Sequence, residues 1–160
     1  MTIAVGDSIP DVRLRLIGTL SSEQVSTADV LGKGRVVLFG VPAAFSPTCS
    51  DVHLPGFIAH AEELHARGVD RIFCVSVNDH YVMAAWGRSQ GTGDKVSLLA
   101  DGNGEFTSAV GLEMDGSGFG LGTRSQRYAM VLEDGVVTGL FVEPGGGLTV
   151  SAADAVLEQL

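Results

Sequence analysis

Two apolar runs that flank an amphipathic segment constrain the fold of this chain more than any other feature. Residues 35–40 (RVVLFG) and 71–77 (RIFCVSV) are mostly apolar, which is typical of strands buried on both faces of a sheet. Between them, residues 46–68 carry apolar side chains at helical spacing, namely Leu54, Phe57, Ile58, Ala61 and Leu64. Strand, helix and strand in this order predict two parallel strands joined by a right-handed crossover. Pro55 and Gly56 predict a kink or break in the helix after its first two turns.

The rest of the chain adds further strands and helices. Strands are predicted over residues 12–17, 96–100, 128–132 and 136–142, and helices over residues 27–31, 80–88 and 103–110. Ser151 is predicted to cap a last helix with Ala155, Val156 and Leu157 inward. Asp134 and Gly135 predict a hairpin turn between the last two strands. Residues 111–123 are Gly-rich and predicted to be irregular. We therefore predict a single α/β domain over residues 1–160, in which helices cover both faces of a central mixed sheet to give three layers.

Charge and composition exclude several classes of function. The chain has 160 residues and a net charge of -9, which disfavours nucleic acids and anionic membranes as partners. No apolar run approaches the length that spans a bilayer. The first residues, MTIAVGD, have neither the basic region nor the apolar core of a secretory signal. Because two cysteines in this context are typical of a reducing compartment, we expect a cytoplasmic protein.

Cys49 lies where a protein can make a sulfur reactive, at the junction of a buried strand and a helix. Ser46 is predicted to cap the helix with its hydroxyl, and Pro47 to occupy the first helical position. Free backbone amides and the positive end of the helix dipole favour a thiolate there. A free cysteine is otherwise most often a small core hydrophobe. We interpret Cys49 as a reactive thiol, which requires a site that favours ionisation, since an ordinary thiol has a pKa of about 8.5.

The sequence around Cys49 resembles a known family. Residues 42–50 (PAAFSPTCS) are similar to the active-site signature of the peroxiredoxins, Pro-x-x-x-Thr/Ser-x-x-Cys. Four further segments resemble the plant type II and mammalian type V branch: HLPGF at 53–57, CVSVND at 74–79, AWG at 85–87 and RYAMV at 127–131. The resemblance runs nearly end to end. It implies a thioredoxin-like fold and the reduction of hydrogen peroxide and organic hydroperoxides at the expense of a thiol, without a metal or organic cofactor.

The resemblance also implies a role for each matching residue. Cys49 matches the peroxidatic cysteine, whose thiolate attacks the terminal peroxide oxygen and becomes a sulfenic acid. Ser46 matches the Thr/Ser position that hydrogen-bonds the peroxide, and Pro42 matches the proline that shields the sulfur from water. Arg127 matches the arginine that supports the thiolate and polarises the peroxide, as a fixed cation beside a sulfur should. Arg124 competes with Arg127 by composition alone and is at best a more distant support.

Two positions depart from the family pattern, and they bear on the substrate and on how the sulfur is reduced. Ala43 replaces a usual glycine, and its methyl could narrow the peroxide pocket and alter substrate preference. Val150 stands about where branch members that close an intramolecular disulfide carry a second cysteine. The remaining cysteine, Cys74, lies in a predicted buried strand, where burial raises a thiol pKa and blocks access. We therefore predict a one-Cys cycle in which glutathione, glutaredoxin or thioredoxin reduces Cys49, while a route through Cys74 after local unfolding stays open.

Other interpretations remain beside this one. A peroxide sensor would be oxidised at Cys49 and relay that oxidation to a partner without efficient turnover, and an inactive thioredoxin-like domain would do neither. His60 and His65 do not share a helix face, which argues against a zinc site. Residues 116–122 lack the spacing of a nucleotide-binding loop and predict a mobile active-site loop. Because branch members commonly pair near such loops, the resemblance implies a homodimer through the active-site side.

Overall fold

A mixed sheet of seven strands forms the centre of the computed structural model, which describes residues 1–18 and 21–160. Its strand order is β2-β1-β5-β4-β3-β8-β9. The bounds are β1 (Arg13–Ile17), β2 (Ser22–Ser26), β3 (Arg35–Gly40), β4 (Arg71–Ser76), β5 (Ser97–Ala100), β8 (Tyr128–Glu133) and β9 (Val136–Val142). β3, β4 and β5 are parallel, and the other neighbouring pairs are antiparallel. The predicted parallel pairing and the final hairpin are both confirmed.

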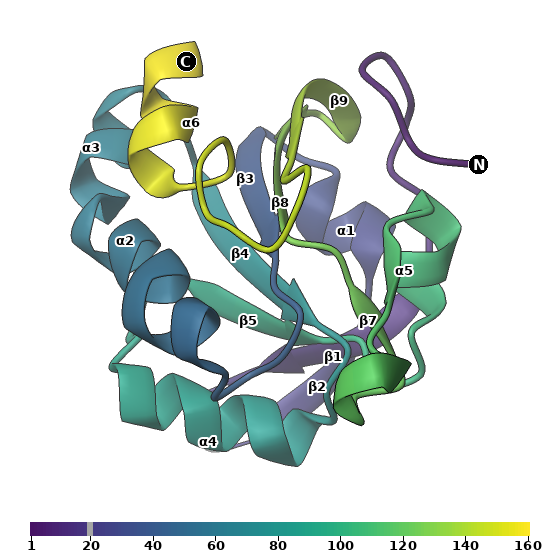
Figure 1. Cartoon of the computed structure of the whole chain (residues 1–160). Helices are drawn as coiled ribbons and strands as arrows, with labels where there is room; N and C mark the ends of the chain where they lie inside the picture. Colours follow the sequence, from purple (N-terminus) through teal and green to yellow (C-terminus); the bar gives the residue numbers. More distant parts are fainter. Residues whose placement is uncertain (19–20) are drawn as a thin grey trace.

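Helices cover both faces of the sheet and complete a thioredoxin-like three-layer sandwich (Figure 1). The helices are α1 (Thr27–Leu31), the π-helix η1 (Cys49–His53), α2 (Leu54–Ala59), α3 (Ala61–Ala66), α4 (His80–Gln90), α5 (Glu105–Val110) and α6 (Ala153–Gln159). One apolar cluster includes side chains of η1, α2, α3, α4 and α6, and a second includes those of α1 and α5. The two clusters lie on opposite faces of the sheet.

The alternation of side chains along β3 shows why its sequence is apolar throughout. Val37 and Phe39 belong to the cluster under α2, α3, α4 and α6, whereas Val36 and Leu38 belong to the cluster under α1 and α5. All four are fully buried. A central strand with helices on both faces therefore has no solvent-facing position for a polar residue.

Two small pieces of sheet are not predicted by the apolar pattern. β2 reads SEQVS and has no fully buried residue, because it is an edge strand whose backbone bonds to β1, and Val25 alone of its side chains packs against an apolar cluster. Residues 111–123 are also less irregular than predicted. They contain β6 (Glu113–Asp115) and the short 3-10 helix η2 (Ser117–Phe119), and β6 pairs with β7 (Thr123–Ser125). Strands of three residues are too short for any periodicity to show.

The helix that follows Cys49 breaks later than predicted. Its first part is the π-helix η1, in which the Leu54 N–H donates to the Cys49 carbonyl five residues earlier. The wide turn ends just before Pro55, which occupies the first turn of α2, where a missing N–H breaks no hydrogen bond. The break comes instead at His60, between α2 and α3. Of the predicted kink or break at Pro55–Gly56, the break is therefore wrong, because the helix continues from a π-turn through the proline.

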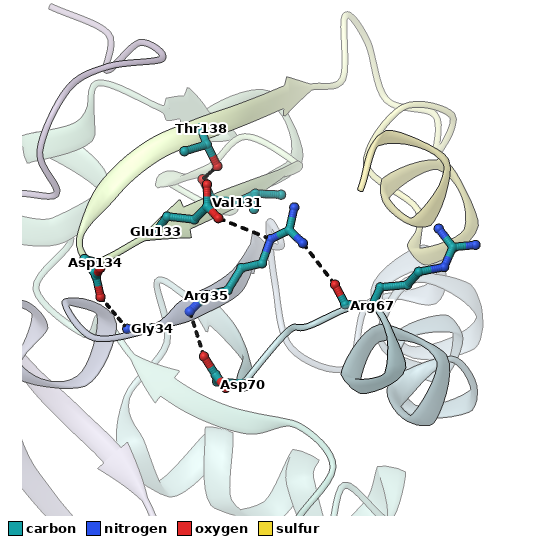
Figure 2. Close-up of polar contacts among 8 residues, drawn as sticks. All are labelled: Gly34, Arg35, Arg67, Asp70, Val131, Glu133, Asp134 and Thr138. Carbon is teal, nitrogen blue, oxygen red and sulfur yellow. Dashed lines mark hydrogen bonds and ion pairs between the residues drawn. The ribbon is translucent and has the colours of Figure 1, made fainter.

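Polar contacts fix β3 at the end far from Cys49 (Figure 2). The Arg35 backbone N–H donates to the Asp70 carboxylate at 2.8 Å, and its guanidinium donates to the Arg67 carbonyl at 3.0 Å. The same guanidinium lies 3.8 Å from the Glu133 carboxylate at the end of β8. The adjoining hairpin turn has positive φ at Asp134 (48°) and Gly135 (82°), as the predicted Asp-Gly turn requires.

The last helix differs from its prediction in how it begins. α6 starts after Ala152, and the Ser151 hydroxyl donates to the Glu143 carboxylate instead of capping the helix. Val156 and Leu157 are buried as predicted, but Ala153 takes the inward position expected of Ala155. Within residues 1–18 and 21–160, no helix has the length and apolar character needed to cross a bilayer.

Candidate active site

The loop between β3 and η1 brings Cys49 to the carboxyl ends of the parallel strands. The Val41 N–H extends the sheet by donating to the Val75 carbonyl at 3.1 Å. The Asn78 side-chain oxygen, which follows β4, accepts the Ala44 N–H at 3.0 Å. Phe45 then turns the chain with φ of 65°, a conformation that only a few per cent of non-glycine residues adopt. β3, β4 and their loops together determine where the next helix begins.

Ser46 precedes the helix as predicted, but its hydroxyl does not cap it. The hydroxyl donates to the Ala43 carbonyl at 2.7 Å, whereas the Ser46 carbonyl accepts the Ser50 N–H at 2.9 Å. The helical backbone starts at Pro47, which makes Cys49 the third helical residue. The prediction of a side-chain cap was wrong, since the partner of the hydroxyl is the Ala43 carbonyl and not a backbone N–H of the first turn.

Arg127 and Cys49 are brought together from positions 78 residues apart. An Arg127 guanidinium nitrogen, Nη2, donates to the Cys49 sulfur at 3.2 Å. Cys49 is fully buried and Arg127 is 8% exposed. Across residues 1–18 and 21–160, neither ion pair in the protein involves Arg127. The guanidinium therefore has the Cys49 sulfur, rather than a carboxylate, as an acceptor.

His53 completes the surroundings of Arg127 from the same helix as Cys49, one turn on. Its Nδ1 lies 2.9 Å from Arg127 Nη1, and its Nε2 lies 3.0 Å from the Ser151 carbonyl. A carbonyl only accepts, so Nε2 carries the proton and Nδ1 accepts from Arg127. Burial, together with the Arg127 charge, lowers the pKa of His53 to about 4, although the Ser151 contact and Glu143 oppose this. The imidazole is therefore neutral at physiological pH.

Glu143 continues this network beyond His53. Its carboxylate accepts hydrogen bonds from the backbone N–H and the hydroxyl of both Thr149 and Ser151, at 2.6 to 2.9 Å. Burial alone would raise the pKa of Glu143, but these bonds outweigh it and lower the pKa to about 2. The side chain is 6% exposed and stays ionised. The sequence singled out neither Glu143 nor Thr149, because no local motif marks a contact that depends on how a loop closes.

Two other residues considered from the sequence, Cys74 and Arg124, have distinct positions. Cys74 is fully buried in β4 as predicted, and burial, with Cys49 as a further cause, raises its thiol pKa against the opposing effect of Arg127. Both cysteines are free thiols. Arg124 makes no contact with Cys49: it donates to the Val77 and Leu121 carbonyls at 2.7 and 2.9 Å. It joins two loops of the site rather than acting on the sulfur.

A cavity of about 300 Å³ adjoins the site, with Pro42, Arg127 and Glu143 among its lining residues. Pro42 therefore lies on the approach to Arg127. The Trp86 indole N–H donates to the hydroxyl of Ser50, the residue after Cys49, at 3.0 Å. Among the described residues, no three His, Cys, Asp or Glu side chains form a metal-binding group. His60 instead contacts Glu63, and His65 contacts the Val69 carbonyl.

Comparison with known proteins places these features in a family. The redoxin family model matches residues 4–157. The chain is 53% identical to peroxiredoxin-2E-2, chloroplastic, of Oryza sativa subsp. japonica, covering 99% of this chain and 73% of that protein. It is 51% identical to peroxiredoxin-2B of Arabidopsis thaliana, covering 99% and 98%. The crystal structure of reduced Prx3 of Vibrio vulnificus in complex with hydrogen peroxide has a TM-score of 0.93 at 46% identity, covering 99% of each chain.

Proposed function

Because this chain belongs to the redoxin family and is a plant type II-like peroxiredoxin within it, we propose that it reduces hydrogen peroxide and organic hydroperoxides through Cys49. Thiol-dependent peroxidase activity is the activity of the peroxiredoxins. The observation that carries the assignment to Cys49 is the hydrogen bond from buried Arg127 to its sulfur at 3.2 Å. A guanidinium beside a buried sulfur favours the thiolate, which is the nucleophile.

The proposed step moves one oxygen from peroxide to sulfur. The Cys49 thiolate attacks the terminal oxygen, the O–O bond breaks, and the sulfur is oxidised to a sulfenic acid. The leaving group, hydroxide or alkoxide, takes a proton from solvent and becomes water or an alcohol. In this proposal Arg127 also donates to the oxygen on which charge develops. Ser46 is proposed to hydrogen-bond the peroxide. Pro42, which lines the cavity beside Arg127, is proposed to keep water from the sulfur.

We further propose a one-Cys cycle. Cys74 is fully buried in a central strand, and its raised pKa disfavours the thiolate that would attack a sulfenic acid. Val150 occupies the loop position at which a second cysteine would be expected. An external thiol, namely glutathione, glutaredoxin or thioredoxin, therefore restores Cys49 in this proposal.

Intact-mass measurement after one equivalent of hydrogen peroxide, without added thiol, tests both proposals. We expect the reduced protein to gain one oxygen on Cys49 and to lose it on addition of glutathione. Loss of two hydrogens within one chain would mean that Cys49 and Cys74 form a disulfide, which contradicts the one-Cys cycle. No rapid change would contradict the peroxidase itself, and oxidation without turnover in the presence of thiols would indicate a sensor.

A homodimer in the cytoplasm completes the proposal. Phe45, which precedes the helix of Cys49, is 53% exposed, and Phe119, in the Gly-rich segment, is 88% exposed. Exposed aromatic side chains of this size favour an interface. Sedimentation of the wild type and of Phe119→Ser tests this: we expect a dimer that the substitution weakens, and a wild-type monomer would contradict it. Fractionation of the source cell tests the compartment.

A further inference from the structure

Glu143 lies near Arg127, and a buried carboxylate in such a place would ordinarily form an ion pair with the arginine. Its hydrogen bonds go to other residues instead. Glu143 and Arg127 are backbone neighbours, since the Glu143 N–H donates to the Arg127 carbonyl at 3.0 Å. Yet the ion pairs found among the described residues do not join them. All four hydrogen bonds to the carboxylate come from Thr149 and Ser151 instead. A carboxylate bound to Arg127 would compete with the sulfur for the guanidinium, so this arrangement leaves the cation to Cys49.

The segment that Glu143 holds reaches the sulfur through a continuous series of hydrogen bonds. The Ser151 N–H and hydroxyl donate to Glu143, while the Ser151 carbonyl accepts from His53. His53 in turn accepts from Arg127 Nη1, and Arg127 Nη2 donates to Cys49. All five of these residues are at least nine-tenths buried. Water therefore does not readily replace a lost member.

We propose that Glu143 is a positioning residue, which holds the loop at Thr149 and Ser151 so that His53 fixes the Arg127 guanidinium against the Cys49 sulfur. The catalytic importance of this inference rests on the proposed function. The hydrogen bonds themselves form without peroxide. The planar geometry of Arg127 explains the need for such positioning. One nitrogen must reach the sulfur while the other is held by the imidazole, and a planar fork does both only in one orientation.

Glu143→Gln tests the proposal, with Glu133→Gln as the matched control. The introduced amide presents N–H groups where Thr149 and Ser151 also donate, so the loop loses part of its anchor. We expect the rate of Cys49 with hydrogen peroxide to fall about tenfold, the effect of one charge-assisted hydrogen bond. The pH midpoint of Cys49 alkylation by iodoacetamide, followed by site-resolved mass spectrometry, should rise. Glu133→Gln removes the same charge from a side chain 53% exposed near Arg35 and should change neither.

A His53→Phe background separates positioning from general damage. Phenylalanine keeps an aromatic ring beside Phe39 and Phe57, whose rings lie 4.9 and 5.6 Å from that of His53, but it accepts nothing from Arg127. If Glu143 acts through His53, Glu143→Gln should leave the pH midpoint of alkylation nearly unchanged in this background. It should change the rate with hydrogen peroxide by less than about twofold, since effects within one network do not add. Equal effects in both backgrounds would overturn the proposal, as would a Glu143→Gln protein that behaves like wild type.

Two further measurements keep the result decisive. Should Glu143→Gln fail to fold, Ser151→Ala removes one of the four hydrogen bonds to Glu143 and keeps the others. Its alkylation midpoint should therefore rise, by less than the rise expected of Glu143→Gln. An unchanged Ser151→Ala protein would then overturn the proposal. If wild-type protein reacts slowly with peroxide, the proposed function fails, but the alkylation midpoint still shows whether Glu143 positions Arg127.

Discussion

Buried guanidinium groups require a counter-charge or a full set of acceptors, because desolvating an isolated cation is costly. The partners that the structure shows for the Arg127 side chain are a neutral imidazole and the sulfur of Cys49. At the scale of single residues, the orientation of one buried cation therefore depends on these two acceptors.

Arg127→Lys tests whether the shape of the cation matters as well as its charge. A lysine keeps the charge but cannot bond to Cys49 and His53 at once. We expect the second-order rate with hydrogen peroxide, measured by stopped flow, to fall about tenfold or more. Arg124→Lys is the control, because Arg124 contacts the Val77 and Leu121 carbonyls rather than the sulfur. Equal losses in the two variants would contradict the role given to Arg127.

Tyr128 provides a prediction about stability alone. Its ring is fully buried, and its hydroxyl has no hydrogen-bond partner among the described residues. Burial, followed by Asp101 and Cys74, raises its pKa, so the hydroxyl stays protonated. Tyr128→Phe removes an unpaired polar group and should leave the free energy of unfolding unchanged or raise it by about 1 kcal/mol. Urea denaturation measures this, and a clear loss of stability would reveal a partner for the hydroxyl.

Pairs of elements, rather than single residues, determine where the site stands. β3 pairs with β4 on one side and with β8 on the other, so the loops that carry Cys49, Asn78 and Arg127 adjoin neighbouring strands. β3 and β8 pack tightly where Gly40 lies opposite Tyr128. A Cβ at Gly40 would lie 2.3 Å from the Tyr128 ring. Glycine is required here by packing, not by backbone conformation.

Gly40→Ala should therefore cost about 1–3 kcal/mol of stability, the usual effect of overpacking. Thermal denaturation measures the loss, and the control Gly146→Ala, at a position with open space around a Cβ, should have little effect. Combining Gly40→Ala with Tyr128→Phe should not restore stability, because the contact is with ring carbons that both residues have. Restoration would show that the hydroxyl, and not the ring, causes the conflict.

For the molecule as a whole, the buried groups of the site predict how stability depends on pH. The pKa of His53 is lowered to about 4 from an ordinary 6.5, so the unfolded chain binds its proton more readily than the folded protein. Stability therefore falls as pH decreases from about 6.5 to about 4. The pKa of Glu143 is lowered to about 2 from 4.5, and its contribution is lost as pH falls further, between those values.

Protonation of His53 should lower the free energy of unfolding by about 3 kcal/mol between pH 7 and pH 4. Urea midpoints over this range measure it. His53→Phe should flatten the slope between pH 6.5 and 4, whereas His65→Gln, at a residue in contact with the Val69 carbonyl, should retain it. A slope that survives in His53→Phe would assign the pH dependence to other groups.

Much of this architecture could be predicted because burial on two faces leaves a strong pattern. The strands 35–40 and 71–77, the stripe from Leu54 to Leu64, and the Cys49 helix start all follow from residues close in sequence. The edge strand β2 could not, since it has a single apolar residue, Val25, and therefore no apolar alternation. The connection of His53 to Glu143 could not either, because it requires a loop 98 residues from His53 to place a carbonyl at the imidazole.

The hydrogen bond from Trp86 to Ser50 has a practical consequence. Trp86 is the single tryptophan of the chain, and its indole N–H bonds to the residue next to Cys49. Tryptophan emission therefore comes from one indole bonded to the residue that follows Cys49. If Cys49 is oxidised as proposed, we expect this emission to change, which would provide an optical reporter of oxidation that needs no label.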